Sequence, residues 1–248
     1  MDIKLTERQE KILDVIIREY VNSAQPISSQ LLEKKYDFNI SPATIRIEMQ
    51  KLTDKGFLLQ PHTSAGRIPT DKGYRLFVNN LLEKKSKNTD EIGDWLEKDI
   101  KDNFKFIQSF TRHIAEETRA LTLSYLEKED LFWTEGWEEV LKEPEFEERD
   151  FLLNFTNFLK TFENHIDELE DNSNINVYIG KENPLPKAKD FSVISSRYRL
   201  PNGEEGVISI LGPKRMEYDK NISLITSLAE ALAEAREEYL LFEHKIIR

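Results

Sequence analysis

The sequence predicts an α+β protein built from two domains, and three observations support this. The first 85 residues contain a sharply delimited helix followed by a basic stretch rich in Gly and Pro. From residue 92 onward, apolar residues recur mainly at helical spacing, which predicts a helix-rich second part. Nearer the C-terminus, short segments alternate apolar and polar residues, as half-buried strands do. A small antiparallel sheet is therefore expected in the second domain.

Two helices are expected at the N-terminus. Thr6 followed by Gln9 resembles a capping box, and the apolar residues after it recur with a period near 3.6. The first helix is therefore expected to end near Asn22. The segment SAQPIS indicates a turn, after which Ser28 is placed to cap a short second helix.

The best-defined helix lies between Ser41 and Gly56. Ser41 can accept a hydrogen bond from a free amide of the first turn, and Pro42 suits the first helical position. Gly56 can end the helix in a left-handed conformation. Three apolar residues share one face of this helix: Ile45, Met49 and Leu52. The opposite face carries side chains that form hydrogen bonds or present methyl groups.

A Gly- and Pro-rich hairpin follows this helix. Residues 57–60 are expected to form a strand, PHTSAG a tight loop, and residues 67–69 the returning strand. Thr70 is placed to cap a fourth helix. Two helices joined by a turn and followed by a hairpin predict a winged helix-turn-helix, which binds DNA with its second helix in the major groove.

The outward face of the second helix of the motif offers candidates for base contact. Arg46 can form two hydrogen bonds with guanine, and Gln50 can pair with adenine. Three side chains offer methyl groups that can pack on thymine: Ala43, Thr44 and Ile47. The alternative is a solvated face, in which Arg46 pairs with Glu48 or Asp54 and a partner domain buries Ile47.

The hairpin loop is the second candidate contact surface. Short side chains around Gly66 allow backbone amides to approach phosphates, and Arg67 can enter a minor groove, which makes it our first choice. Four other residues suit phosphate contact and a solvated surface equally well: Gln30, Lys51, Lys72 and Arg75. The complete predicted DNA-binding set is Gln30, Ser41, Ala43, Thr44, Arg46, Ile47, Gln50, Lys51, His62, Thr63, Ser64, Gly66, Arg67, Lys72 and Arg75.

The net charge of −11 argues at first sight against a polyanionic partner, because Lys and Arg dominate binding to phosphates. The distribution of charge removes that objection. Residues 1–85 carry 14 Lys and Arg against 11 Asp and Glu, whereas the remaining residues carry 21 against 35. An acidic body behind a mildly basic head would help to orient docking on DNA. An equally acceptable interpretation is that the acidic residues only maintain solubility.

The second domain is expected to begin near residue 86, because residues 83–91 contain no large apolar side chain. Helical spacing with many aromatic residues runs from about 92 to 121, a short strand fits residues 131–133, and residues 137–170 are expected to be helical again. The later elements are strands at 175–179, 192–198 and 207–211, the last two forming a hairpin, and a final helix from about Tyr218.

Several strings resemble the HrcA family of bacterial heat-inducible transcription repressors. In the N-terminal part these are QPISSQLL, SPATIR, EM and PHTSAGRIPTDKGYR, of which PHTSAGRIPT followed by GYR is the most specific. In the C-terminal part they are GWEEVLKEPEF, VYIGKENP, FSVISSRY and GVISILGPKRMEYDKNISLI. The resemblance implies a DNA-binding domain over residues 1–85 and a GAF-like regulatory and dimerisation domain over residues 86–248.

The chain differs from the family pattern in two places. Family members usually carry Asn at the position of Ile47, so the preferred operator is expected to differ. Between about residues 86 and 131 the chain is shorter than the family, whose members hold an inserted dimerising domain there. The aromatic-rich segment is the natural substitute, and the residues expected at the dimer contact are Trp95, Phe104, Phe106 and Phe110. The alternative, that these residues are domain core, is equally acceptable.

The resemblance implies a repressor of chaperone genes that binds an inverted-repeat operator and releases it on heat shock. It also implies that the chaperonin GroEL keeps the repressor active. An inverted repeat requires a two-fold dimer, because two identical domains must meet symmetric half-sites. Two alternatives stay open: a winged-helix regulator of other genes that senses a small ligand, and a protein-interaction module that has lost operator binding.

Enzymatic and metal-dependent functions are not favoured. The chain has no cysteine, and its four histidines show no metal-ligand spacing. It contains neither a GxSxG motif nor a Gly-rich phosphate loop, so no catalytic residue and no cofactor are predicted. No apolar run approaches the roughly 20 residues of a membrane span, and the N-terminus is polar, so a cytoplasmic location is expected.

Overall fold

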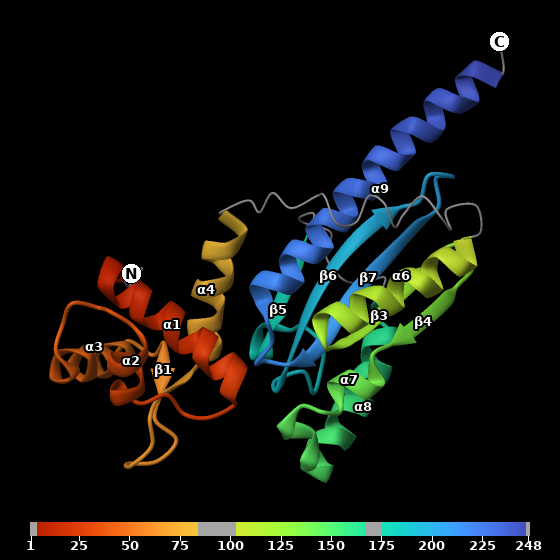
Figure 1. Ribbon diagram of the computed structural model, residues 1–248. Coiled ribbons are helices and arrows are strands. Elements are labelled where there is room, and N and C mark those ends of the chain that lie inside the picture. The colour runs from red at the N-terminus through yellow and green to blue at the C-terminus, as the bar shows by residue number, and fades with distance from the viewer. Residues whose placement is uncertain (1–3, 84–102, 167–174, 247–248) are drawn as a thin grey trace. The chain divides into compact units, whose positions relative to one another are not determined.

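The computed structural model describes residues 4–83, 103–166 and 175–246 (Figure 1). The chain divides into two compact units, Met1–Lys84 and Lys85–Arg248. The N-terminal unit is mainly helical, and the C-terminal unit combines helices with an antiparallel sheet. The predicted α+β class is therefore confirmed. In the part of the chain that is described, no helix is long and apolar enough to cross a membrane.

The N-terminal unit contains helices and a two-stranded antiparallel sheet. In chain order its described elements are α1 (Glu7–Ser23), α2 (Ser29–Lys35), α3 (Pro42–Asp54), β1 (Leu58–Leu59), β2 (Ile68–Pro69) and α4 (Asp71–Glu83). The two strands pair with Leu58 opposite Pro69 and are shorter than predicted. The order of elements agrees with the sequence-based expectation.

Side-chain caps fix where these helices begin. Thr6 and Gln9 form both bonds of a capping box at α1, as predicted. Ser28 accepts a hydrogen bond from the amide of Leu31, and Ser41 accepts one from the amide of Thr44. Each bond satisfies an amide that has no partner inside the helix. The residues at which α2 and α3 begin are thus fixed by the serine that precedes each helix.

A buried carboxylate joins α1 to α3. The side chain of Glu48 is 3% exposed and accepts hydrogen bonds from Gln9 at 2.9 Å and from Arg8 and Lys51 at 3.1 Å each. The hydrogen bond from Gln9 is the main reason that the pKa of Glu48 lies below its ordinary value. The carboxylate therefore stays ionised and tied to three partners.

A second polar contact joins α1 to the end of α2. Lys35 donates to the carboxylate of Glu19 at 2.7 Å, and the hydroxyl of Tyr36 donates to the same carboxylate. The bond with Glu19 raises the pKa of Tyr36 to about 12. These three residues hold α2 against α1. Because Glu48 also joins α3 to α1, both α2 and α3 are positioned by contacts with α1.

The described part of the C-terminal unit is built on a five-stranded antiparallel sheet in the order β4-β3-β7-β6-β5. The strands are β3 (Leu121–Leu126), β4 (Leu131–Glu135), β5 (Asn176–Ile179), β6 (Phe191–Arg199) and β7 (Glu205–Pro213). The helices are α6 (Asn103–Thr118), α7 (Trp137–Val140), α8 (Arg149–Glu163) and α9 (Tyr218–Ile246). The hairpin predicted from the second and third C-terminal strands is the β6–β7 pair.

Helices cover both faces of this sheet. Thr111 on α6 donates to Ser124 on β3 at 2.7 Å, so α6 packs on the face that Ser124 presents. The opposite face carries Leu121, Leu123 and Tyr125, which share a core with the phenylalanines of α8. Figure 1 shows α6 and α9 along one face of the sheet, with α8 behind the other.

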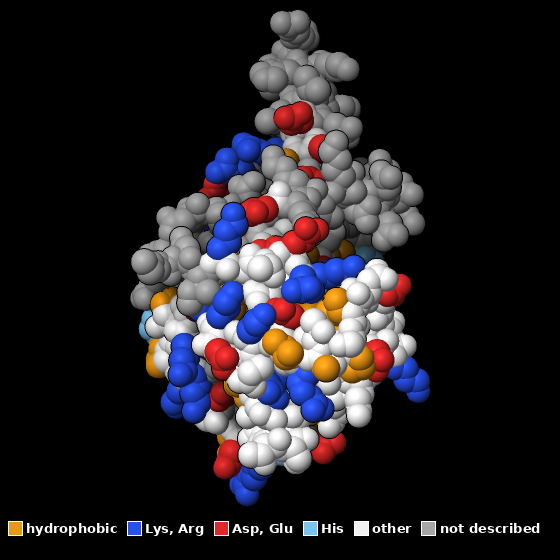
Figure 2. Space-filling model, turned by 90° about the vertical axis from the view of Figure 1, so that its left-hand side faces the viewer, with side chains coloured by type: hydrophobic (Ala, Val, Ile, Leu, Met, Phe, Trp, Pro, Cys, Tyr) orange, Lys and Arg blue, Asp and Glu red, His pale blue; other side chains and the backbone are white. Residues whose placement is uncertain are grey.

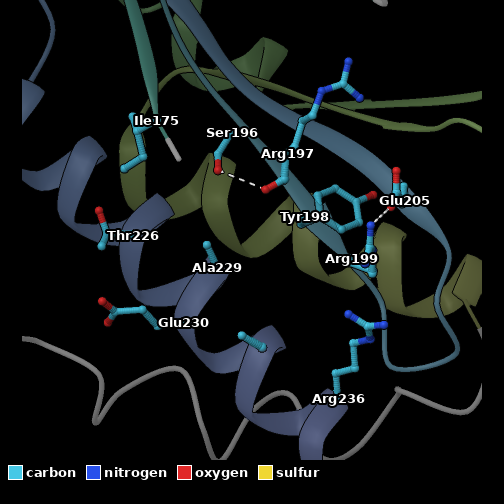
Figure 3. Close-up of a pocket in the computed structure, with 11 residues that line it drawn as sticks. Ile175, Ser196, Arg197, Tyr198, Arg199, Glu205, Thr226, Ala229, Glu230 and Arg236 are labelled. Carbon is cyan, nitrogen blue, oxygen red and sulfur yellow. Dashed lines mark hydrogen bonds and ion pairs between the residues drawn. The ribbon is translucent and has the colours of Figure 1, made fainter. Parts of the chain in front are cut away.

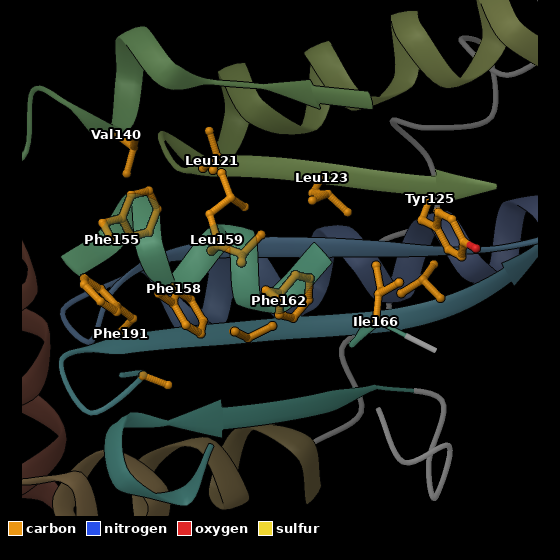
Figure 4. Packing of buried hydrophobic residues seen from close by; sticks show 14 of the residues in the cluster. Leu121, Leu123, Tyr125, Val140, Phe155, Phe158, Leu159, Phe162, Ile166 and Phe191 are labelled. Atoms are coloured by element: carbon orange, nitrogen blue, oxygen red, sulfur yellow. The ribbon is translucent and has the colours of Figure 1, made fainter. Parts of the chain in front are cut away.

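The α8 face of the sheet is filled by aromatic side chains. Phe155, Phe158 and Phe162 of α8 are each 0% exposed (Figure 4). Phe158 stacks on Phe191 of β6 at a ring-centroid distance of 5.2 Å, and Phe155 meets the same ring edge-on at 5.2 Å. The predicted apolar stripe of this helix is thus the core of the unit.

The structure corrects two sequence-based assignments in this unit. The predicted helical segment ends before Leu121, where β3 begins, and this strand was not predicted. The segment expected to be helical from 137 to 170 is broken into α7, a 3-10 helix at Pro144–Glu147 and α8. Pro144 explains the break, because proline lacks the amide that a continuous helix needs.

The predicted dimer contacts are also partly wrong. Phe106 and Phe110 are 2% and 0% exposed and stack on each other inside the unit at 5.6 Å, so a partner cannot reach them. Phe104 is 47% exposed and lies edge-on to Trp133 at 5.5 Å. Trp95 lies outside the described residues. Phe104 alone of the described predicted residues presents an aromatic surface.

Candidate nucleic-acid interface

A polar concavity of about 430 Å³ opens between α2, α3 and the hairpin loop. Its walls contain six of the predicted DNA-binding residues: Gln30, Arg46, Thr63, Ser64, Gly66 and Arg67. Figure 2 shows the side of the N-terminal unit that carries α2 and α3, where Lys and Arg side chains are interspersed with uncharged polar groups and fewer carboxylates. The structure thus brings the predicted helix and loop candidates together on one surface.

Arg46 is exposed and makes no hydrogen bond or ion pair with any described residue. The acidic neighbours that could have paired with it are engaged elsewhere. Glu48 is buried with Arg8 and Lys51, and Asp54 accepts a hydrogen bond from Gln50. The guanidinium of Arg46 is therefore available to a ligand from outside.

The rest of the outward face of α3 is also accessible. Ile47 is 54% exposed, and Ser41 and Ala43 are exposed as well. Thr44 is half-buried, and its hydroxyl lies 3.0 Å from that of Ser41. An isoleucine this exposed has no packing role within the unit, so its side chain is free to contact an apolar group.

Arg67 lies against α3 and does not extend from the loop. Its Nε donates to Thr53 at 3.0 Å, and one terminal nitrogen donates to the side-chain oxygen of Gln50 at 2.9 Å. The amide nitrogen of Gln50 in turn donates to Asp54 at 2.8 Å. Arg67 and Gln50, predicted as separate base contacts, therefore bind each other.

Hydrogen bonds within the loop hold it in a compact shape. The side-chain amide of Gln60 donates to the carbonyls of Thr63 and Ala65 at 2.9 and 3.0 Å. His62 Nδ1 and the hydroxyl of Ser64 lie 3.1 Å apart. These side chains are exposed apart from Gln60 and Ala65, so the loop presents polar groups to solvent on an ordered backbone.

The base of the loop is joined to the turn between α1 and α2. Ile27 and Arg67 exchange two backbone hydrogen bonds, of 2.9 and 2.8 Å. Gly66 approaches so closely that a Cβ atom there would lie 2.3 Å from the carbonyl oxygen of Ile27. Only glycine fits at this position, which explains its place in the PHTSAGR string.

The four residues that suit a solvated surface as well as phosphate contact are mostly engaged within the unit. Lys51 pairs with Glu48, and Lys72 donates to the carbonyl of Lys55 at 2.9 Å while lying 4.4 Å from the ring centre of Phe57. Arg75 is half-buried and also has an interaction within the chain. Gln30 is exposed and lines the concavity.

Five residues of the concavity were not among the predicted site residues: Ser28, Ser29, Met49, Gln60 and Ala65. Ser28 and Ser29 begin the second helix, so their proximity to Gln30 was a usable signal. The sequence around Gln60 gave no such signal, because its hydrogen bonds depend on the fold of the loop that follows it. Among the described residues, no group of three His, Cys, Asp or Glu side chains is placed to hold a metal ion.

Comparison with known proteins places the chain in a family. The model described as "HrcA protein C terminal domain" matches residues 72–222, more than half of the chain. The chain belongs to the HrcA family. A solved structure described as a crystal structure of a hypothetical protein shares the fold, with a TM-score of 0.79, 21% sequence identity, and 95% of this chain and 100% of that chain covered.

Named members of the HrcA family align with nearly the whole chain. The heat-inducible transcription repressor HrcA of Natranaerobius thermophilus is 27% identical over 342 residues, covering 97% of this chain and 100% of that protein. The HrcA of Thermoanaerobacter sp. strain X514 is 30% identical, covering 92% and 96%. An alignment of 342 residues exceeds the 248 of this chain, so the first relative holds a stretch without a counterpart here.

A third relative is more similar over a shorter stretch. The HrcA of Alkaliphilus metalliredigens is 46% identical over 120 residues, which is 48% of this chain and 35% of that protein. Membership of the HrcA family agrees with the resemblance found in the SPATIR and PHTSAGRIPTDKGYR strings.

Proposed function

We propose that this chain is a transcriptional repressor of heat-shock genes whose N-terminal unit is a winged helix-turn-helix that binds operator DNA. The observation that carries the proposal is the concavity between α2, α3 and the loop, where an exposed Arg46 has no described partner. The relatives' name, heat-inducible transcription repressor, supports the regulatory role.

In this proposal α3 enters the major groove with its N-terminal half facing the bases. Arg46 forms two hydrogen bonds with a guanine, and Ala43 and Ile47 pack on thymine methyl groups. Because Ile47 offers no hydrogen bond, this position distinguishes bases by apolar contact alone. Thr44 lies beside the phosphate backbone at the start of the helix.

The loop supplies contacts that fix the position of the protein on the duplex. Thr63 and Ser64 are exposed, and their hydroxyls and backbone amides are suited to phosphate oxygens. In the free protein Arg67 donates a hydrogen bond to the side chain of Gln50 on α3. When DNA binds, the same guanidinium lies at the edge of the concavity, from which it contacts the backbone.

We further propose that the repressor acts as a two-fold dimer on an inverted repeat, with its two α3 helices about 34 Å apart. Phe104, which lies edge-on to the half-buried Trp133, is the part of the predicted dimer contact that stays accessible in the described residues. The chaperonin GroEL, implied by the resemblance, is included as the partner that keeps the repressor active.

Fluorescence anisotropy with a labelled inverted-repeat duplex, recorded at several salt concentrations, tests the proposal. Replacing Arg46 with Ala is expected to weaken binding by about 1–3 kcal/mol, the usual cost of one base contact. A scrambled duplex should bind weakly, and its affinity should change little when Arg46 is replaced. The matched control is Arg112→Ala, an exposed arginine of the C-terminal unit. Unchanged affinity after replacing both Arg46 and Arg67 would overturn operator recognition by this surface.

A further inference from the structure

The C-terminal unit contains a pocket of about 500 Å³ between β6 and α9 (Figure 3). It lies beside the last four residues of β6, from Ser196 to Arg199. Among the described strands β5 pairs with β6 only from Ser192 to Ser195, so it does not reach this part of β6. The volume falls within the range of about 300–1,000 Å³ typical of pockets for small molecules.

One wall of the pocket is apolar. The side chains of Ala229 and Ala233 on α9 are small, which leaves space between this helix and the sheet, and Ile175 closes one end. The ring of Tyr198 is 5% exposed and lies over Gly206, where a Cβ atom would be 2.6 Å from the ring. The absence of a side chain at Gly206 lets the tyrosine lie flat over β7.

Two hydroxyl groups add polarity to the apolar wall. The hydroxyl of Ser196 donates to the carbonyl of Arg197 at 3.1 Å, and that of Thr226 donates to the carbonyl of Ile222 at 2.8 Å. Because the Thr226 hydroxyl uses its proton in this way, its oxygen can act as an acceptor toward a ligand. A few polar groups on a mainly apolar surface are typical of small-molecule sites.

The arginines of the pocket differ in their partners. Arg197 forms an ion pair with Glu127, and Arg199 forms one with Glu205. Arg236 makes no ion pair or hydrogen bond with any described residue, although its Nε atom is buried. A buried polar atom of a charged group without a partner is costly, so a guanidinium in this position favours an anion from outside.

We propose that this pocket binds a small organic acid with a single carboxylate. The carboxylate bonds with Arg236, whose planar guanidinium matches it with two parallel hydrogen bonds, and the apolar part of the acid lies against Ala229 and Ala233. The lining contains three arginines against two glutamates, a balance of +1. Glu230, exposed on α9, repels ligands with several negative charges.

The site is separate from the DNA-facing residues of the N-terminal unit, so it does not depend on operator binding. Its occupant would be sensed by α9, which forms one wall of the pocket and continues to Ile246. A failure of the operator-binding experiment would leave this inference intact, and the reverse also holds.

Isothermal titration calorimetry of the full chain with 2-naphthoate and with its uncharged amide, 2-naphthamide, tests the proposal. Saturable binding of naphthoate is expected with a dissociation constant below about 1 mM. The Arg236→Gln variant should weaken naphthoate binding at least tenfold and leave the weaker naphthamide binding unchanged. Hexanoate should bind in the same manner, and inorganic phosphate should compete poorly because it carries more charge.

Two further variants make the test independent of any folding defect in Arg236→Gln. Ala229→Phe fills the pocket and should abolish binding of both naphthyl compounds, whereas Arg112→Gln removes an arginine paired with Glu135 outside the pocket and should change neither. Circular dichroism confirms that each variant is folded. The proposal is overturned if no acid binds saturably, if naphthamide binds as tightly as naphthoate, if phosphate is preferred, or if binding survives both pocket substitutions.

Discussion

Arg67 and Gln50 are joined by a hydrogen bond of 2.9 Å across 17 positions of the sequence. Gln50 passes the connection on to Asp54, to which it donates at 2.8 Å. The two residues come from the loop hairpin and from α3, and each alone has the chemistry of a base contact. Because they are bonded, neither can move toward DNA without affecting the other.

A double-mutant cycle measures this connection. Operator affinity is expected to fall with Arg67→Ala and with Gln50→Ala, but the double variant should lose less than the sum. The expected coupling energy is about 0.5–3 kcal/mol, as for residues in one hydrogen-bonded network. Arg67 and Arg46 form the control pair, since no bond joins them. Their losses should add within about 0.5 kcal/mol, and additivity of Arg67 with Gln50 would show that the bond is irrelevant to binding.

Gly66→Ala is expected to destabilise the N-terminal unit. The added Cβ would lie 2.3 Å from the carbonyl oxygen of Ile27, and the backbone must move to relieve this contact. A cost of about 1–3 kcal/mol is typical of such overpacking. Hydrogen exchange of the segment around Ile27 should accelerate, and operator affinity should fall. Gly212→Ala is the control, because its nearest neighbour would be the Met216 methyl at 3.6 Å. Unaltered exchange in the Gly66 variant would contradict the close approach.

The stability of the N-terminal unit should depend on pH through Glu48. Its hydrogen bond from Gln9 lowers the pKa of this carboxylate below 4.5 in the folded state. Since the folded pKa is depressed, the stabilisation is present above about pH 4.5 and is lost as the pH falls through the folded pKa. Urea denaturation followed by circular dichroism at pH 7 and pH 3.5 measures the loss.

The Glu48→Gln variant should be less stable than the native chain at pH 7, and the difference should shrink at pH 3.5. Glu33→Gln serves as control, because Glu33 is exposed and makes no ion pair with a described residue. Its effect should be small at both pH values. A Glu48 difference that is the same at both pH values would exclude the carboxylate as the source of the dependence.

Self-association should depend on Phe104. Its ring is 47% exposed beside Trp133, and Phe104→Ser is expected to weaken the dimer at least about fivefold, equivalent to about 1 kcal/mol for an interface aromatic. Sedimentation equilibrium gives the dissociation constant. Leu153→Ser is a matched control, since Leu153 on α8 is 48% exposed. If the two substitutions changed the dissociation constant equally, the dimer contact would lie away from Phe104.

The N-terminal elements could be predicted from the sequence because their signals are local. Thr6 with Gln9, Ser28 and Ser41 act on amides three residues away, so the caps are visible without tertiary structure. Gly56 adopts a φ of 78°, the left-handed conformation expected at the end of α3. The final helix begins at Tyr218, as predicted from its apolar spacing.

The missed strand β3 had no local signal of this kind. All residues from Leu121 to Leu126 are buried, because α6 covers one face of the sheet and α8 the other. A strand buried on both faces does not alternate apolar and polar residues, so LTLSYL continued the helical pattern that preceded it. Phe106 and Phe110 were misassigned for a related reason, since an apolar stripe does not reveal whether its partner is the same chain or another.

The side-chain interactions of the candidate interface also depend on contacts between distant residues. Arg67 was predicted to project into a groove, but its bonds to Thr53 and Gln50 require α3 to lie beside the returning strand. The pocket at Arg236 was likewise not evident, because it depends on where β5 begins relative to β6.

The two backbone bonds between Ile27 and Arg67 give the proposed DNA-binding surface a fixed geometry before any duplex arrives. A surface that folds already shaped loses its conformational entropy during folding, so docking on DNA does not have to order the loop again. A second consequence concerns binding to the wrong DNA sites. A duplex whose groove does not match the shape of this surface cannot be accommodated by bending the loop toward it. Selectivity between DNA sites would then depend on the fixed geometry of the loop as well as on the individual contacts with bases.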